Sequence, residues 1–324
     1  MPPAPSSLPV VFCFAGQGAQ YYHMGADLLE HEPVFRQWMR IGDQLVRERH
    51  GISLLQATYD PDRRLSDPFD RLAVTHPALF LVQYAAAKLM QHHGVRPDML
   101  LGVSLGEFCG MAVSGMVSFE TMLGAIADKP PLFARTCPPG GLIAVLAPPE
   151  VQADSAVLAA RTELVGVSAD RHITLAALAE DLPAVEDELR RRDLIFQRLP
   201  VPHPFHSRWI DGAEAALRAD LDPPRETGFW PVWSCRAVAP IDTRTPDLAW
   251  RIVRDPMKVR ATVKALEDAG GARYVDISPS GTFAALIRQT LARESPSRVW
   301  PVLSPTGGNL KRLRHVLDAL APTA

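Results

Sequence analysis

The stretch Arg96-Pro-Asp-Met-Leu-Leu-Gly-Val-Ser-Leu-Gly-Glu-Phe108 runs from an apolar strand through a glycine-flanked turn into a helix. Gly102 and Gly106 have no side chains, so strand and helix can pack closely while Ser104 lies at the tip of the turn. The first helical turn directs unpaired N–H groups at this tip, where the N–H of Leu105 could stabilise an oxyanion. The pattern indicates a serine nucleophile for acyl chemistry in an α/β fold, although so short a motif also arises by chance in strand-to-helix connections.

The composition is that of an ordinary globular protein of 324 residues, 47% hydrophobic and 22% charged. A formal net charge of −2 does not favour a nucleic-acid binder. Residues 1–9 contain no basic stretch leading into an apolar one, and no apolar run reaches about 18 residues, so we expect no membrane association and a cytoplasmic location. Four cysteines without C-x-x-C or paired-histidine spacing are expected to be reduced and free of metal. They are Cys13, Cys109, Cys137 and Cys235.

Strand and helix patterns alternate through most of the chain, which predicts a large α/β domain around a parallel sheet. Pro77 is expected in the first turn of its helix, and either Ser118 or Thr121 as the cap of the next one. The expected strands are 10–14 and 273–277, and the expected helices are 24–49, 76–93, one ending near 115, one beginning near 118 and one beginning at 282.

Between two proline-rich segments the order changes to βαββαβ, which is the ferredoxin-like arrangement. The large domain is therefore expected to be α/β-hydrolase-like and discontinuous, formed by residues 1–136 and 200–324, with a ferredoxin-like subdomain of residues 137–199 inserted in it. Within the insert the expected strands are 141–146, 164–168, 172–176 and 194–198, and the expected helices are 149–162 and 182–192.

A serine hydroxyl needs a base within hydrogen-bond reach, most often a histidine. His203 and His206 lie in the proline-constrained loop 201–207, where the insert rejoins the large domain, and clefts form at such junctions. From spacing alone, either histidine could be the base, or the loop could be purely structural. The histidines expected to be solvated, because their segments are charged and helical, are His31, His50, His92, His93 and His315.

Five motifs, in order and at matching spacing, resemble the acyltransferases that serve fatty acid and polyketide synthases, including malonyl-CoA:acyl-carrier-protein transacylases. The resemblance covers nearly the whole chain, and the inserted subdomain is also a feature of that family. The motifs are Phe14-Ala-Gly-Gln-Gly-Ala-Gln20, Thr75-His-Pro-Ala-Leu-Phe80, Gly102-Val-Ser-Leu-Gly-Glu107, His203-Pro-Phe-His206 and Asp276-Ile-Ser-Pro-Ser-Gly281.

The resemblance implies a Ser–His dyad, with Ser104 as nucleophile and His206 as base. A main-chain carbonyl within 255–259 would orient the imidazole, and the N–H groups of Gln17 and Leu105 would form the oxyanion hole. The enzyme would take an acyl group from a thioester onto serine and pass it to the phosphopantetheine thiol of an acyl carrier protein, with no metal or redox cofactor. The substrate-binding candidates are His76, Val103, Lys129, His203 and Phe205.

The chain departs from the malonyl-transferring members, which hold the substrate carboxylate with an arginine 25 residues after the nucleophile. Counting from Ser104 leads to Lys129. A lysine lacks the bidentate fork of arginine, and losing one charge-assisted hydrogen bond costs roughly 1.5–3 kcal/mol. Pro130 and Pro131 are expected to end the helix there. A local shift of the alignment could instead bring Arg135 within reach.

His76 and Val103 also depart from the family, which commonly has glutamine and histidine at these positions. Valine makes the pocket drier, and a histidine could titrate near neutrality. We expect His76 to be a helix-start residue bonded to the backbone. Together the departures resemble a branch found with polyketide synthases that use separate, trans-acting acyltransferases, in which the arginine is lost and acyl groups are removed from stalled carriers. Related stand-alone members move larger acyl units between carriers.

We therefore expect an acyl-carrier-protein hydrolase or a non-malonyl transacylase. The alternative is a malonyl-CoA:carrier transacylase that uses Lys129 or Arg135, and a non-catalytic carrier-docking module is disfavoured by the intact serine and histidine. An acidic carrier would dock on a basic surface, for which Arg190-Arg-Arg192, Arg208 and Arg288 are candidates. Arginines at the end of a helix can equally serve to complement its dipole.

Overall fold

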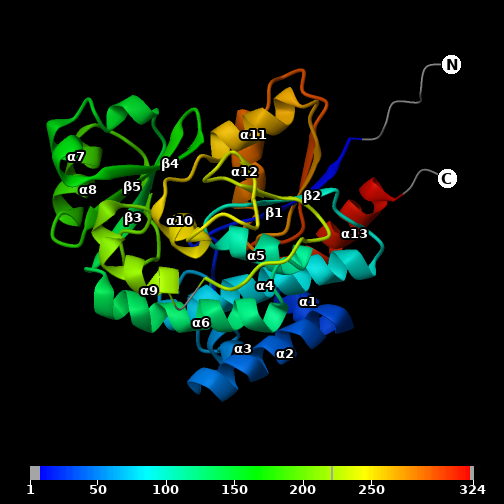
Figure 1. Cartoon of the computed structure of the whole chain (residues 1–324). Helices are drawn as coiled ribbons and strands as arrows, with labels where there is room; N and C mark the ends of the chain where they lie inside the picture. The colour runs from blue at the N-terminus through cyan, green and yellow to red at the C-terminus, as the bar shows by residue number, and fades with distance from the viewer. Residues whose placement is uncertain (1–7, 220–221, 322–324) are drawn as a thin grey trace.

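The computed structural model describes residues 8–219 and 222–321. A sheet ordered β10-β9-β1-β2-β7-β8 forms the centre of the larger part of the molecule (Figure 1). All its pairings are parallel except that of β8, which runs antiparallel to β7. The predicted α/β class and parallel sheet are confirmed. The strands are β1 (Val10–Phe14), β2 (Met99–Gly102), β7 (Val232–Ser234), β8 (Ala239–Pro240), β9 (Arg273–Asp276) and β10 (Arg298–Pro301).

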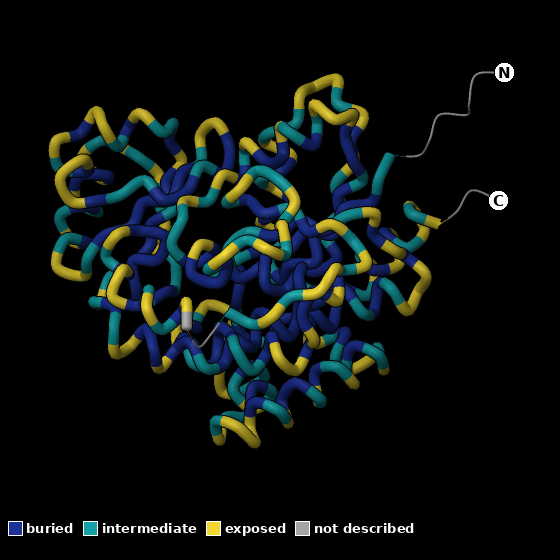
Figure 2. Tube along the Cα trace, in the orientation of Figure 1, coloured by how far each residue is buried: buried dark blue, intermediate teal, exposed yellow. Residues whose placement is uncertain are grey.

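Helices cover both faces of this sheet, because successive side chains of a strand point to opposite faces. On β1, Phe12 and Phe14 belong to the core of one face, and Val11 and Cys13 belong to the core of the other. Buried segments fill the middle of the molecule and exposed ones form its rim (Figure 2). The helices are α1 (Ala26–His31), α2 (Pro33–His50), α3 (Leu54–Thr58), α4 (Leu72–His92), α5 (Leu105–Ser114), α6 (Phe119–Thr136), α9 (Glu214–Ala219), α10 (Leu248–Arg254), α11 (Val259–Asp268), α12 (Thr282–Thr290) and α13 (Asn309–Leu320).

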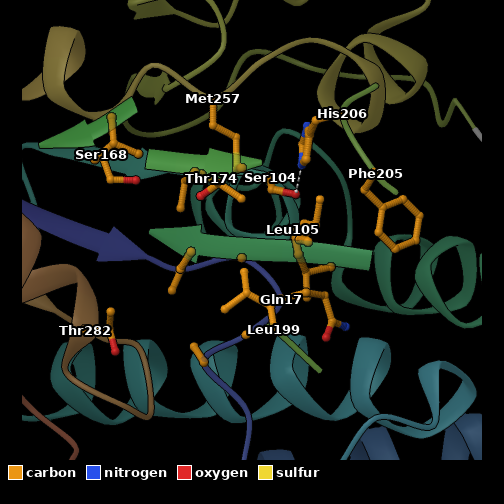
Figure 3. A pocket seen from close by; sticks show the side chains of 18 of the residues that line it. Gln17, Ser104, Leu105, Ser168, Thr174, Leu199, Phe205, His206, Met257 and Thr282 are labelled. Carbon is orange, nitrogen blue, oxygen red and sulfur yellow. Dashed lines mark hydrogen bonds between the residues drawn. The ribbon is translucent and has the colours of Figure 1, made fainter. Parts of the chain in front are cut away.

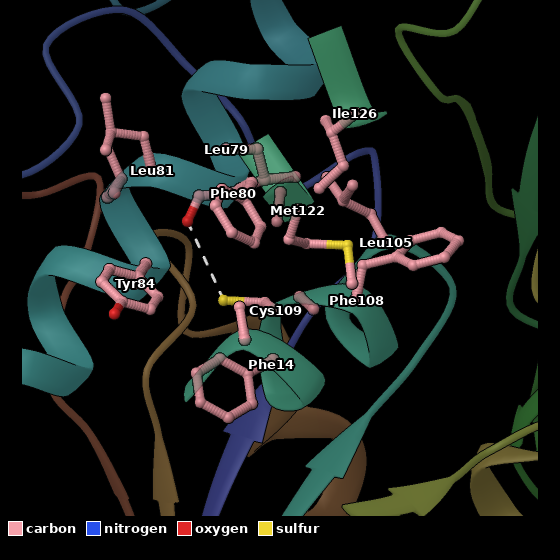
Figure 4. Packing of buried hydrophobic residues seen from close by; sticks show 14 of the residues in the cluster. Phe14, Leu79, Phe80, Leu81, Tyr84, Leu105, Phe108, Cys109, Met122 and Ile126 are labelled. Carbon is pink, nitrogen blue, oxygen red and sulfur yellow. Dashed lines mark hydrogen bonds between the residues drawn. The ribbon is translucent and has the colours of Figure 1, made fainter. Parts of the chain in front are cut away.

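Helix α4 is the central helix of the first face and is buried along nearly all of its length. Tyr84 of α4 packs on Phe119 of α6, with ring centroids 4.5 Å apart. Phe80, Phe108 and Met122 extend the same cluster to α5 (Figure 4). Because such interiors are close-packed, α5 and the turn before it are held on a rigid base.

Among the residues that the structure describes, three prolines lie inside helices, contrary to expectation. Helix α4 begins at Leu72, so Pro77 lies beyond its first turn. Helix α6 continues through Pro130 and Pro131 to Thr136. A proline in a helix interior costs about 3 kcal/mol. The turn beyond the two prolines carries buried Leu132 and Phe133, and burying each side chain contributes about 1.5–3 kcal/mol, which offsets that cost.

Two expected helices are interrupted. The helix predicted over 24–49 is two helices, α1 and α2, because the chain is extended at Glu32 and Pro33 starts the second helix. The helix predicted over 149–162 is a 3₁₀ turn (Pro149–Val151) followed by α7 (Ala156–Arg161). Ser155 separates them by accepting a hydrogen bond from the N–H of Leu158 as the cap of α7.

The second sheet has the order β4-β5-β3-β6, and all its neighbouring strands are antiparallel. With α7 and α8 on one face, this is the ferredoxin-like arrangement predicted. All its strands lie within 140–198, while the domain boundaries themselves remain a prediction. The elements are β3 (Gly140–Val145), β4 (Glu163–Ala169), β5 (His172–Leu178), α8 (Leu182–Arg191) and β6 (Phe196–Arg198).

The four cysteines are all buried and free. No helix in the described ranges is both long and apolar enough to cross a membrane. Within the same ranges, no cluster of three or more histidine, cysteine or carboxylate side chains could hold a metal ion.

Candidate active site

Ser104 lies on the turn between β2 and α5 with φ 53° and ψ −122°, a conformation that is rare for a residue with a side chain. Gly102 and Gly106 on either side of it must be glycine, because a side chain there would clash with the main chain. A Cβ added to Gly102 would lie 2.5 Å from the backbone of Glu107, and one added to Gly106 would lie 2.0 Å from the carbonyl oxygen of Phe14. Since these contacts are with main chain, only glycine lets α5 pack this closely on β1 and β2.

His206 lies beside Ser104 (Figure 3), and its Nε2 is 2.9 Å from the serine Oγ. Its Nδ1 is 2.9 Å from the main-chain oxygen of Asp255, within the segment predicted to orient the imidazole. A carbonyl only accepts, so Nδ1 carries the hydrogen and Nε2 is free to accept the serine proton. Burial lowers the pKa of His206 to about 4, although the hydrogen bond that its ring donates to the main-chain oxygen of Asp255 acts in the opposite direction and raises the pKa. The imidazole is therefore neutral at pH 7.

Gln17 and Leu105, whose N–H groups were predicted to form the oxyanion hole, both line the cavity beside Ser104. Leu105 is the first residue of α5, and Gln17 follows β1 in a loop that lies against Ser104, since a Cβ on Gly16 would be 3.0 Å from the serine Cβ. Among the described residues, neither N–H donates a hydrogen bond to another protein group. Two free donors beside a nucleophile can stabilise a tetrahedral oxyanion.

A cavity of about 210 Å³ adjoins Ser104 and His206, and it is mostly apolar. Val103, Phe205 and His76, which were predicted to bind substrate, are among the residues that line it. No lysine, arginine, aspartate or glutamate occurs among its described lining residues. The arrangement suits an uncharged acyl group next to the serine.

The expectation for His76 was wrong. It lies inside α4, and its Nδ1 is 3.2 Å from the side-chain Nε2 of Gln17 rather than bonded to the backbone. Burial, with a smaller contribution from the charge of Lys129, lowers its pKa to about 3, so it does not titrate near neutrality. His76 instead connects α4 to the loop that carries one of the free N–H groups.

Lys129 and Arg135 do not reach the cavity. Lys129 is fully buried in α6, and its Nζ lies 3.6 Å from the centroid of the Phe108 ring, with no hydrogen-bond partner in the described part of the chain. Burial lowers its pKa to about 7. Arg135 is exposed in the last turn of the same helix. The structure thus contradicts the assignment of Lys129 as a substrate-binding residue and gives Arg135 no access.

His203 was also predicted to bind substrate, but it does not line the cavity. Its Nδ1 is 3.0 Å from the main-chain oxygen of Pro138, and its ring packs on Phe133 and Phe205. Of the two histidines that spacing left open, only His206 therefore reaches the serine.

Several cavity residues could not be found from the sequence. They come from the ferredoxin-like sheet, from the segment after α10 and from α12. Strand alternation shows which of them share a face, but it does not show which part of the large domain that face meets. They are Ser168, His172, Thr174, Gln197, Leu199, Met257, Thr282, Phe283 and Leu286.

The arginines proposed for docking are engaged within the protein. Arg190 pairs with Glu186 and Asp187, and the next two arginines both pair with Glu188. Arg208 pairs with Glu163. Arg288 differs, because its guanidinium donates to the main-chain oxygen of Val299.

This fold and site define an α/β protein of the acyltransferase class. The family model described as "Acyl transferase domain" matches residues 11–323, and the chain belongs to that family. It is 34% identical over 312 residues to the "Polyketide biosynthesis acyltransferase homolog PksD" of Bacillus subtilis, covering 95% of each chain. It is 35% identical over 314 residues to the homolog BaeD of Bacillus velezensis, covering 96% of this chain and 97% of BaeD.

Solved structures share the fold. A loading acyltransferase from the avermectin modular polyketide synthase superposes with a TM-score of 0.85 at 24% identity, covering 97% of this chain and 100% of that one. The MCAT of Streptococcus pneumoniae gives a TM-score of 0.77 at 22% identity, covering 96% and 99%. With the family and the polyketide relatives, the function is of the polyketide synthase acyltransferase type.

Proposed function

We propose that the protein is a trans-acting Ser–His enzyme that removes a non-malonyl acyl group from an acyl carrier protein, through an acyl ester on Ser104, and releases it to water. Transfer to a second carrier thiol differs only in the group that attacks the ester. The carrier supplies the phosphopantetheine arm with the substrate, and we propose no further cofactor. The four free, buried cysteines support a reducing compartment such as the cytoplasm as the place of action.

In the proposed first step, Ser104 Oγ attacks the thioester carbonyl while His206 Nε2 takes the hydroxyl proton. The N–H groups of Gln17 and Leu105 donate to the oxyanion, and the Asp255 oxygen stabilises the imidazolium that forms. As the intermediate collapses, the C–S bond breaks and His206 returns the proton to the departing thiolate. In the second step, His206 takes a proton from water, the hydroxide attacks the ester and Ser104 leaves as the protonated alcohol.

The absence of charge at the described wall of the cavity is the observation that carries the non-malonyl part of the proposal. A malonyl carboxylate would be buried there without a charged partner, and burying an unpaired charge costs several kcal/mol. Lys129 does not supply the missing positive charge, because its amine lies against the Phe108 ring and Lys129 is not among the residues that line the cavity.

The test presents the protein separately with malonyl-CoA and with carrier protein loaded with acetyl or longer acyl groups. Intact mass spectrometry then follows both partners, with Ser104→Ala as the control. Loss of acyl from the carrier, dependent on Ser104, is expected, with free acid as the product. A malonylated serine that is handed to carrier would contradict the proposal in favour of a malonyl transacylase. No change dependent on the serine would favour a non-catalytic docking module.

A further inference from the structure

Met257 lies where the two sheets meet, and its main chain is fixed on both sides. Its N–H donates to the oxygen of Val165 at 2.8 Å, and its oxygen accepts from the N–H of Val167 at 3.0 Å, so it pairs with the edge strand β4. The next N–H, of Lys258, donates to the oxygen of Cys235 beyond β7 at 2.7 Å. Two residues before Met257, the oxygen of Asp255 accepts from His206.

The main chain of Met257 is held by these hydrogen bonds, whereas its side chain lines the acyl cavity (Figure 3). Its end lies over Gly166 of β4: a Cβ added to Gly166 would be 3.2 Å from the Met257 Cε and 3.2 Å from the Cβ of Thr174. Gly166 has no positive φ that would require glycine. Glycine inside a strand costs roughly 0.5–1 kcal/mol relative to alanine, and here it leaves room for both the end of the methionine side chain and Thr174.

We propose that Met257, resting on Gly166, is the residue that determines which acyl chain lengths the cavity accepts. This inference rests on the proposed function, since it assumes an acyl group on Ser104. A methionine side chain has three rotatable bonds and fills space adaptably. Its hydrogen-bonded main chain does not share that freedom. Acyl chains of different length therefore displace the thioether of Met257 and leave the main-chain oxygen of Asp255 in place. Chain length is therefore selected by fit, and the base keeps its geometry.

The test measures acylation of Ser104 by acetyl, butyryl, hexanoyl and octanoyl N-acetylcysteamine thioesters, by intact mass across pH 5 to 9. In Met257→Ala the cavity is deeper, and the octanoyl-to-acetyl ratio of kcat/KM should rise about tenfold or more, as one methylene in an apolar pocket is worth about 10- to 200-fold. In Gly166→Ala the added methyl pushes the thioether into the cavity, so the ratio should fall about tenfold. The pH profile should stay that of the wild type in both.

Gly141→Ala is the matched control, because this glycine lies in strand β3 of the same sheet, outside the cavity lining, and its added Cβ would make only an ordinary 3.4 Å contact with Leu182. It should leave the ratio unchanged. If Gly166→Ala fails to fold, Met257→Val tests whether the side chain at 257 sets the accepted acyl chain length. A stiff β-branched side chain there should narrow the range of acyl chain lengths that acylate Ser104.

Unchanged ratios in Met257→Ala would overturn the inference, as would an equal loss for every chain length with a shifted pH profile, which would make Met257 a positioning residue for His206. Wild-type protein that neither forms acyl-Ser104 nor releases free acid from any thioester would overturn the proposed function and this inference with it. Normal wild-type acylation with unaltered selectivity in the variants would overturn this inference alone.

Discussion

Both residues of the proposed dyad have a positive φ, 53° at Ser104 and 65° at His206. Such conformations cost about 1–3 kcal/mol each and persist only where the surroundings enforce them. At Ser104 the close packing of Gly102 and Gly106 enforces it, and at His206 the N–H is held by the oxygen of Val253 at 3.0 Å. These two backbone conformations direct the side chains toward each other, so that Ser104 Oγ and His206 Nε2 lie 2.9 Å apart.

The pH dependence of acylation should report the low pKa of His206. Because burial lowers that pKa to about 4, the base is neutral at pH 6, and acylation should fall to half only as the pH approaches about 4. Rates of acyl-Ser104 formation between pH 4 and 7, with circular dichroism to confirm folding at each pH, provide the measurement. A midpoint near 6.5, the value of an unperturbed histidine, would contradict this assignment.

Replacing Lys129 by methionine should stabilise the protein near neutral pH. The amine is buried without a hydrogen-bond partner in the described structure, and an unsatisfied buried group costs about 1–3 kcal/mol. Its pKa is lowered to about 7 from 10.5, so between these values the unfolded chain binds more protons and wild-type stability rises with pH.

The gain of Lys129→Met over wild type in urea unfolding should therefore be largest at pH 6 and shrink towards pH 10. Taking the difference between the two proteins removes the contributions of the other titrating groups. A gain that is constant with pH, or a loss of stability at pH 6, would show that the amine is neither strained nor titrating as described.

At the scale of elements, the packing of α5 on the central sheet depends on Gly106. Gly106→Ala should destabilise the protein by about 3 kcal/mol and abolish acylation, because its Cβ would lie 2.0 Å from a main-chain oxygen and α5 would have to move. Gly124→Ala is the control: this residue is also inside a helix, α6, where the nearest atom to an added Cβ is 3.7 Å away, on the flexible Arg49 side chain.

Because alanine favours helix over glycine by about 1 kcal/mol, Gly124→Ala should stabilise the protein by up to that amount. Urea unfolding gives both values. Equal effects of the two substitutions would mean that helix propensity, and not the close approach of α5 to β1, decides the requirement for glycine at 106.

Short sequence patterns predicted a helix, strand or turn correctly where a single residue type fixes the backbone conformation. They failed where tertiary packing determines whether a helix continues. The turn at Ser104 and the βαββαβ order follow from glycine spacing and from strand alternation. The proline rule failed at Pro77 and Pro130, because the burial of distant apolar residues keeps both helices continuous. Burial of this kind depends on tertiary partners that a local pattern does not contain.

At the scale of the whole molecule, the dyad was predictable only through the family's motifs, since spacing left His203 and His206 equivalent. The structure separates them, because the loop after the inserted sheet turns one ring onto Pro138 and the other onto Ser104. The residues that meet between the two sheets could not be predicted from the sequence. Met257 reaches the cavity through pairing with β4, a contact between segments that are far apart in sequence.

Carrier docking should depend on Arg288 more than on the arginines of α8. Arg288 is exposed on α12, whose Thr282 and Leu286 line the cavity, and no carboxylate in the described chain lies within ion-pair distance of it. Arg190, by contrast, is already balanced by Glu186 and Asp187.

Arg288→Gln should therefore raise KM for acyl-carrier protein about threefold to tenfold and reduce its dependence on salt, since charges at the rim of an interface act mainly through steering. Acylation by a small thioester, which needs no carrier, should keep its rate. Arg190→Gln is the matched control and should change KM for the carrier less than about twofold, because a charge paired at the surface contributes little. An effect of Arg190→Gln as large as that of Arg288→Gln would move the carrier's binding surface to α8.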